Sequence, residues 1–176
     1  MAKHGLKEPT RLATRDDSGL YQVIVETPKA CRNKFAYDPH KRIFCLRKVL
    51  PAGMAFPYDF GFLPGTLAED GDPVDVLLLM DEPAYPGVVV QARLIGIIEG
   101  EQIEGKKRVR NDRVLAVADA THRYADVKKF TDLPAHFIKE LEEFFVNYHR
   151  LEGKQYQLLG CHGAATARRL IDQAAA

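Results

Sequence analysis

The chain has 176 residues, and its 25 lysine and arginine residues balance 24 aspartate and glutamate residues to leave a formal net charge of +1. This length predicts a single domain over residues 1–176, and the small net charge excludes a global attraction to nucleic acid or to an anionic membrane. Apolar residues make up 46% of the chain and charged residues 28%, which is typical of a folded globular protein and excludes disordered, collagen-like and coiled-coil classes.

Both ends of the chain are predicted to be frayed, because residues 1–17 are polar and residues 174–176 are three alanines. The longest uninterrupted apolar run, Val76–Met80, is far shorter than the ~18–20 residues that cross a bilayer. Residues 1–9 contain no apolar segment of the kind found in secretory signals. Three scattered cysteines do not make a disulfide framework, and we expect them to be reduced and mostly buried. We therefore expect a cytoplasmic protein with no membrane partner.

Five segments are predicted to be strands, because β-branched residues alternate with polar ones or because a short apolar run ends at a glycine or proline turn. They are Tyr21–Thr27, Ile43–Leu46, Val74–Leu79, Val88–Ile98 and Arg113–Ala118. Short strands at irregular spacing, without helices between them, favour an antiparallel barrel over a parallel sheet.

Two helices are predicted after residue 125. The first begins at Pro134, placed as the first residue of a helix, and ends near Gly153. Its apolar residues recur at the spacing of an amphipathic helix, at Phe137, Leu141, Phe144, Phe145 and Tyr148. The second helix is predicted over residues 163–173. The expected fold class is therefore α+β, mostly β: a small five-stranded barrel with two flanking helices.

The strongest chemical signal is a run of three aspartates, Asp70, Asp72 and Asp75, that leads directly into an apolar strand. In a strand, Asp75 shares a face with Leu77, where an unpaired carboxylate is costly to bury. Gly71 and the following residues bend the chain, so the three carboxylates can converge on one point, and Mg²⁺ prefers such oxygen ligands. The alternative is a surface turn, which Asp-Gly-Asp-Pro alone also predicts.

Two weaker chemical signals are better explained by ordinary structural roles. The basic run Lys106–Arg110 is typical of a solvated hairpin tip, and no array of aromatic residues accompanies it for base stacking, so we expect no nucleic-acid partner. Cys161, His162 and His149 do not make a zinc site without a suitably spaced fourth ligand.

The segment Asp70–Asp75, with the sequence D-G-D-P-V-D, resembles the signature of the family I soluble inorganic pyrophosphatases. The similarity continues in the family's order at Val23–Pro28, Asn33–Phe35, Pro86–Gly96, Val114–Val117, Phe144–Tyr148 and Gly153–Lys154. It covers roughly residues 20–172. The resemblance implies a five-stranded OB-like antiparallel barrel with two helices, and Mg²⁺-dependent hydrolysis of pyrophosphate to two phosphates. It also implies a homo-oligomer, a hexamer by family analogy.

The resemblance assigns roles to matching residues on the acidic side. It implies that Asp70 and Asp75 are metal ligands and that Asp72 is the catalytic carboxylate that polarises the attacking water. Glu26 resembles an outer acid for further Mg²⁺. This chemistry is consistent, because cations neutralise the phosphate oxygens and two metals can lower the pKa of a water between them.

On the substrate side, Lys34 and Tyr148 resemble contacts to the pyrophosphate oxygens, and Tyr148 is also expected to act in catalysis. Lys48 stands where the family usually has an arginine, with Arg47 beside it, and His149 stands where it usually has a lysine. We expect both Lys48 and His149 to bind substrate, His149 as an imidazolium that titrates near neutrality.

Three further departures remove family side chains. Ala36 replaces an acid, and Phe56 and Phe60 replace two tyrosines, so two hydroxyl donors are missing. The metal core therefore resembles the family's, whereas the phosphate-binding part is rebuilt.

The family's D-x-K motif reads Asn111-Asp112-Arg113 in this chain. Arg113 is expected to bind substrate. Gap-free counting points to Asn111 as the third metal ligand, but a carboxylate suits Mg²⁺ better, and a one-residue bulge would present Asp112, which we prefer. A further metal-binding acid is expected at Glu101, unless it is lost to Gln102.

Two other functions stay open. One is a related phosphoanhydride hydrolase that accepts a longer polyphosphate or a nucleotide, because the phosphate-binding residues have changed. The other is a non-catalytic OB-type binding module that keeps the acidic residues for structure.

Overall fold

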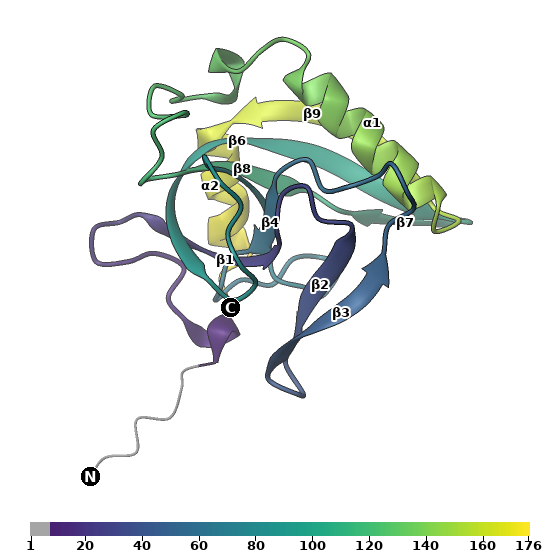
Figure 1. Ribbon diagram of the computed structural model, residues 1–176, viewed down its shortest axis with the longest axis horizontal. Coiled ribbons are helices and arrows are strands. Elements are labelled where there is room, and N and C mark those ends of the chain that lie inside the picture. The colour runs from purple at the N-terminus through teal and green to yellow at the C-terminus, as the bar shows by residue number, and fades with distance from the viewer. Residues whose placement is uncertain (1–7) are drawn as a thin grey trace.

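Five strands pair into a closed ring in the computed structural model, which describes residues 8–176. In ring order they are β1 (Tyr21–Thr27), β4 (Asp59–Phe62), β5 (Asp75–Leu79), β8 (Arg113–Ala118) and β6 (Val89–Glu104), and β6 pairs again with β1 (Figure 1). Within these residues the ring pairs are antiparallel except β5–β8, which is parallel. The mostly-β class with two flanking helices is confirmed, and the parallel pair is the one difference from a purely antiparallel ring.

The central strands of the ring are buried on both faces. Val76 and Leu78 of β5 belong to a first core that α2 (Ala164–Gln173) completes with Ala167 and Ile171. Leu77 and Leu79, which point the opposite way, belong to a second core. This two-sided burial explains why β5 is an uninterrupted apolar run.

Helix α1 (Phe137–Arg150) covers the second core with Phe137, Leu141, Phe145 and Tyr148. It begins three residues after the predicted start, because Pro134 belongs to a turn whose carbonyl accepts the Phe137 N–H at 2.9 Å. It also ends at Arg150, before the predicted end near Gly153. The stripe of apolar residues was predicted correctly, and only the ends of the helix were misplaced.

Four strands were not predicted, and two predicted strands extend further than expected. β3 (Ile43–Val49), predicted over Ile43–Leu46 as a strand of the barrel, instead forms a separate hairpin with β2 (Asn33–Asp38) beside the ring (Figure 1). β4 takes the expected place of β3 in the ring. The other differences are β4, β7 (Lys107–Arg110), β9 (Gln155–Gly163) and the extension of β6 to Glu104. β9 pairs along β6, and Gln155 and Gln157 are exposed on either side of the buried Tyr156. Short 3-10 turns are present at Pro9–Arg11 and Phe130–Asp132.

The described parts of both ends, where we expected fraying, make backbone hydrogen bonds to the segment before β5. The Leu67 N–H donates to the Ala174 carbonyl at 2.7 Å, and the Ala176 N–H donates to the Gly65 carbonyl at 3.0 Å. The Gly65 N–H in turn donates to the Thr10 carbonyl at 3.0 Å. Residues 1–7 of the predicted frayed segment lie outside the described residues. Within residues 8–176, no helix has the length and apolar character needed to cross a membrane.

Candidate active site

A cavity of about 820 Å³ opens between the ring, the β2–β3 hairpin and the C-terminal end of α1. All but two of the predicted site residues line it: Glu26, Lys34, Lys48, Asp70, Asp72, Asp75, Arg113, Tyr148 and His149. The two exceptions are Asp112 and Glu101. Residues from five separate parts of the chain therefore meet at one place.

One side of the cavity is an acidic wall made of Glu26, Asp70, Asp72 and Asp75. Asp70 and Asp72 lie on the loop before β5, which turns at Gly71 with a φ of +89°, a conformation that favours glycine. The Asp70 carboxylate accepts the Asp72 N–H at 3.1 Å. Asp75 begins β5, so the loop and the strand present their carboxylates to the same cavity.

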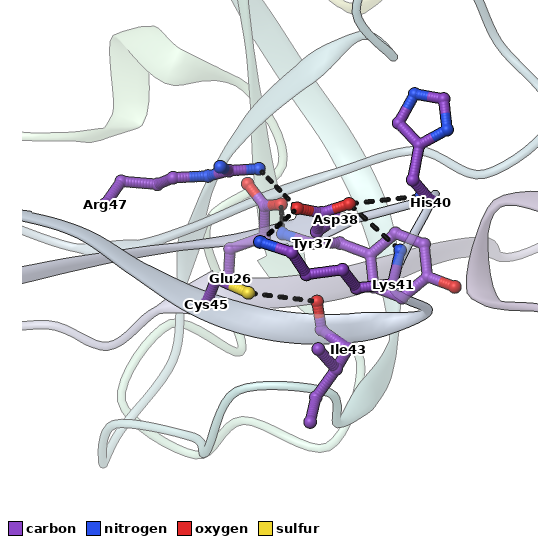
Figure 2. Close-up of polar contacts among 8 residues, drawn as sticks. All are labelled: Glu26, Tyr37, Asp38, His40, Lys41, Ile43, Cys45 and Arg47. Carbon is purple, nitrogen blue, oxygen red and sulfur yellow. Dashed lines mark hydrogen bonds and ion pairs between the residues drawn. The ribbon is translucent and has the colours of Figure 1, made fainter.

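The two deeper carboxylates of the acidic wall hold their protons more tightly than usual. Burial raises the pKa of Glu26 to about 7, and the negative charges of Asp75 and Asp72 add to that shift. The Glu26 carboxylate accepts the Tyr37 N–H at 2.7 Å, which opposes the rise (Figure 2). Burial also raises the pKa of Asp75 to about 6, against the opposing charges of Arg113 and Lys34. A bound cation would favour the ionised form of both groups.

The cavity is also lined by a basic wall, made of Lys34, Lys48 and Arg113 together with Tyr148. Lys34 and Lys48 are register partners across the β2–β3 hairpin. The Lys34 Nζ donates to the Tyr148 hydroxyl at 3.1 Å, and the Lys48 Nζ lies 4.1 Å from the centre of the Tyr148 ring. Lys48 also forms an ion pair with Glu152. The hairpin and α1 thus bring these side chains together at the cavity.

Arg113, the deepest member of the basic wall, is only 3% exposed. Its parallel pairing partner is Asp75, so the ring itself sets a cation beside the acidic wall. Its Nη1 donates to the Asn111 carbonyl at 3.1 Å, and its guanidinium lies 3.8 Å from the centre of the Phe145 ring. Within residues 8–176 no carboxylate lies within ion-pair distance of it, so the charge is available to an anion in the cavity.

His149 lines the cavity but does not titrate near neutrality, and that expectation was wrong. It is 2% exposed, and its Nδ1 lies 2.8 Å from the Phe145 carbonyl. The pKa of His149 is lowered to about 4, mainly by burial and also by the nearby charges of Arg113, Lys34 and Lys48. The side chain is therefore neutral at pH 7 and cannot offer phosphate an imidazolium there.

The geometry favours Asn111 over Asp112 and Gln102 over Glu101 at the cavity. The Asn111 N–H donates to the Gly100 carbonyl at 2.9 Å, so no bulge turns Asp112 inward. The Asp112 carboxylate accepts the Gly100 N–H at 3.0 Å and pairs with Arg110 at 2.9 Å.

Glu101 is likewise paired away from the cavity, with Arg108 at 3.1 Å. Asn111 and Gln102 occupy the cavity side instead. The Asn111 Oδ1 is buried without a hydrogen-bond partner among the described residues. Such an orphaned oxygen is a suitable ligand for a hard cation.

Arg47 also lines the cavity, although the sequence analysis gave it no role. A register shift in the β2–β3 hairpin leaves Arg47 as an extra residue, so that Arg47 and Lys48 both reach the cavity although they are neighbours in a strand. Asp38 holds Arg47 at 3.6 Å (Figure 2). Because neighbouring residues of a regular strand face opposite sides, the sequence predicts that only one of Arg47 and Lys48 faces the cavity. No sequence signal therefore marked Arg47.

Phe56 and Phe60, which replace tyrosines of the family, line the cavity as part of an aromatic cluster. The two rings lie 5.6 Å apart, and Phe56 lies 5.5 Å from Phe144 and 6.0 Å from Tyr148. Where the family's tyrosines would offer two hydroxyl donors, this chain therefore has an apolar part of the cavity lining.

The donor set suits a divalent cation in its chemistry. Within the described residues, no three histidine, cysteine, aspartate or glutamate side chains are arranged to hold a metal ion by themselves. Mg²⁺ does not require such a cage, because it keeps several waters and is usually bound through one or two carboxylates together with substrate phosphates. The acidic wall and the unpartnered Asn111 Oδ1 offer that number of oxygens.

Comparison with known proteins gives a consistent result. Residues 23–176 match the family described as inorganic pyrophosphatase. The chain is 38% identical to the inorganic pyrophosphatase of Nostoc sp. over 164 residues, which cover 93% of this chain and 95% of the relative. It is 37% identical to that of Synechocystis sp. over 164 residues, with the same coverage of both chains. The crystal structure of inorganic pyrophosphatase from Thermus thermophilus superposes with a TM-score of 0.87 at 30% identity, covering 96% of this chain and 97% of the other. The chain belongs to the inorganic pyrophosphatase family.

Proposed function

We propose that this chain hydrolyses inorganic pyrophosphate to two phosphates, with water as the nucleophile and Mg²⁺ as its divalent cation. Membership of a family of divalent-metal-dependent inorganic diphosphatases supports the reaction. The observation that carries the proposal is that one cavity is lined by both an acidic wall and a basic wall. Pyrophosphate needs both, because its oxygens bear negative charge and its hydrolysis needs an activated water.

Asp70 and Asp75 of the acidic wall, together with Asn111 in the same cavity, would hold the metal. Glu26 would serve further Mg²⁺ as an outer acid. Bound divalent cations supply charge neutralisation for the phosphate oxygens and lower the pKa of a water molecule. Asp72, on the exposed loop before β5, accepts the proton of the attacking water as the general base.

On the basic wall, Lys34 and Arg113 donate to the phosphate oxygens, and the hydroxyl of Tyr148 adds a further donor. The hydrogen bond from Lys34 orients that hydroxyl. Lys48 is shared with Glu152, so its contribution to phosphate binding is smaller in the free protein. Charge developing on the leaving phosphate meets donors that are already in place, which is how such sites lower the barrier.

We also propose a single domain over residues 1–176 that assembles as a homo-oligomer, a hexamer by family analogy, in the cytoplasm. Three apolar side chains on β3 support a subunit contact, because Ile43, Leu46 and Val49 are each more than half exposed. Unpaired cysteines at positions 31, 45 and 161 support a reducing compartment. All three are partly exposed, where we expected them to be mostly buried.

A phosphate-release assay tests the function directly. Pyrophosphate, tripolyphosphate and ATP are compared with and without Mg²⁺, and we expect rapid release from pyrophosphate only when Mg²⁺ is present. Faster turnover of tripolyphosphate or ATP would identify the longer-substrate hydrolase. Absence of turnover on all three substrates would identify a binding module.

A further inference from the structure

The guanidinium of Arg113 is held by aromatic rings instead of by a carboxylate. It lies 3.8 Å from the centre of the Phe145 ring and 5.1 Å from the centre of the Tyr156 ring. Its Nε is buried and has no hydrogen-bond partner among the described residues. Aromatic faces attract a cation without neutralising it. The rings therefore set the position of the guanidinium and leave its charge for the cavity.

Tyr156 is itself fixed from two sides. Its hydroxyl lies over Gly100, where an added Cβ would come within 2.1 Å of the oxygen, so glycine is required there. On the other side the imidazole of His149 stacks on its ring, with centroids 4.9 Å apart and an interplanar angle of 15°. A smaller or non-planar side chain at position 149 would free the Tyr156 ring to tilt.

His149 is in turn fixed by the backbone of α1. The Phe145 carbonyl accepts a hydrogen bond from Nδ1, which makes Nδ1–H the donor of a neutral imidazole. A charged side chain here would stand against Arg113, whose positive charge already opposes protonation of His149. The neutral ring adds no second positive charge beside the buried guanidinium.

We propose that His149 and Tyr156 are positioning residues that act through Arg113: the stacked rings hold the guanidinium where it meets the phosphate oxygens. The inference rests on the proposed function, because it concerns how the same site binds pyrophosphate. His149 makes no contact with substrate in this arrangement.

A double-mutant cycle tests the coupling between His149 and Arg113. The values of kcat/KM for pyrophosphate are measured for the wild type, His149→Gln, Arg113→Met and the double variant. We expect His149→Gln to lower kcat/KM roughly tenfold in the wild type and less than about twofold when Arg113 is already Met. Equal losses in both backgrounds, or no loss in the wild type, would overturn the proposal.

Rescue by ring-retaining variants separates positioning from general packing. His149→Phe and Tyr156→Phe keep both planes, and we expect each to retain kcat/KM within about threefold of the wild type. Tyr156→Leu removes the plane, and we expect it to lose roughly as much as His149→Gln. Similar losses in the Phe and Leu variants would contradict a role for the stacked rings.

Thermal unfolding of every variant shows whether it is folded, and His136→Gln, an exposed histidine before α1, serves as the control. If His149→Gln does not fold, the Phe and Leu variants at position 156 still decide the question. The rate at which the wild type hydrolyses pyrophosphate tests the proposed function, independently of the variants. A wild type that hydrolyses pyrophosphate while the cycle shows no coupling would refute the inference alone.

Discussion

The acidic and basic walls of the cavity are built in different ways. The acidic wall comes from β1, the start of β5 and the end of the loop between β4 and β5, and three of its four carboxylates lie within six residues. The basic wall is assembled from the β2–β3 hairpin, β8 and α1, which are far apart in the sequence. Four departures from the family's pattern, at Phe56, Phe60, Lys48 and His149, concern the binding of phosphate. The three aspartates of the acidic wall are kept, and the metal-side departure is Asn111.

Under the proposed function, the difference follows from what each wall would bind. A small hard cation needs oxygen ligands, which the amide of Asn111 can supply as well as a carboxylate, so the metal side would change only among oxygen donors. Phosphate oxygens accept hydrogen bonds from lysine, arginine and tyrosine alike, so the basic wall can be rebuilt from other side chains. Burial favours the neutral form of acids and bases alike in this cavity. It raises the pKa of Glu26 and lowers that of His149. A bound cation would shift Glu26 and Asp75 toward their ionised forms.

Removal of the metal is expected to have the largest effect. EDTA should abolish pyrophosphate hydrolysis and Mg²⁺ should restore it, because the acidic wall alone cannot neutralise the phosphate oxygens. Ca²⁺ should not restore it, since its larger radius and looser coordination place water and phosphate less well. The assay is phosphate release after chelation and readdition of each metal. Full activity in EDTA would rule out the mechanism.

Neutralising the aspartates should have the next largest effect. Asp70→Asn, Asp72→Asn and Asp75→Asn should each lower kcat on the order of 10²-fold or more, because each removes charge from the metal or from the base. Asp126→Asn, on an exposed loop away from the cavity, is the matched control. Turnover near the wild-type value in Asp72→Asn, with normal Mg²⁺ binding, would show that Asp72 is not the base.

Exchange of the two candidate ligands before β8 should have a moderate effect. Asn111→Asp adds a carboxylate to the cavity, and we expect Mg²⁺ to bind roughly fivefold more tightly. Asp112→Asn should leave Mg²⁺ affinity unchanged and lower the free energy of unfolding by ~1–2 kcal/mol, because it weakens the pairing with Arg110. Calorimetric titration with Mg²⁺ measures both affinities. If Asp112→Asn weakened Mg²⁺ binding and Asn111→Asp left it unchanged, Asp112 would be the ligand.

The sequence predicts those parts of the fold that local pattern determines. The bounds of β1 and β8 were predicted correctly, because each is an apolar or alternating run bounded by turns. β9 was missed, since its residues are mostly polar or exposed and its strand character comes from pairing along β6. A strand that depends on a distant partner leaves little trace in its own residues.

The same distinction applies to the site. Asp70, Asp72 and Asp75 were predictable, because one turn and one strand place all three. The choice between Asn111 and Asp112 was not, because it depends on how the Asn111 N–H meets Gly100 across the β6–β7 hairpin. Register is set by long-range pairing, and one step of register exchanges the two faces of a strand.

The smallest expected effect concerns the pH dependence of stability at His149. Burial lowers the pKa of His149 to about 4 in the folded protein, from an ordinary value of 6.5. Between these values the unfolded chain binds a proton that the folded chain does not, so the stability associated with neutral His149 is present above about pH 6.5 and is lost as the pH falls toward about 4.

The variant His149→Phe cannot titrate, so the difference in unfolding free energy between the wild type and this variant isolates the effect. That difference should fall by about 1–2 kcal/mol between pH 7.5 and pH 5, a shift of a few degrees in Tm for a chain of this size. The carboxylates of the acidic wall contribute to both proteins and cancel in the difference. A difference that stays constant with pH would mean that His149 keeps its ordinary pKa, and the neutral ring stacked on Tyr156 would then not describe position 149.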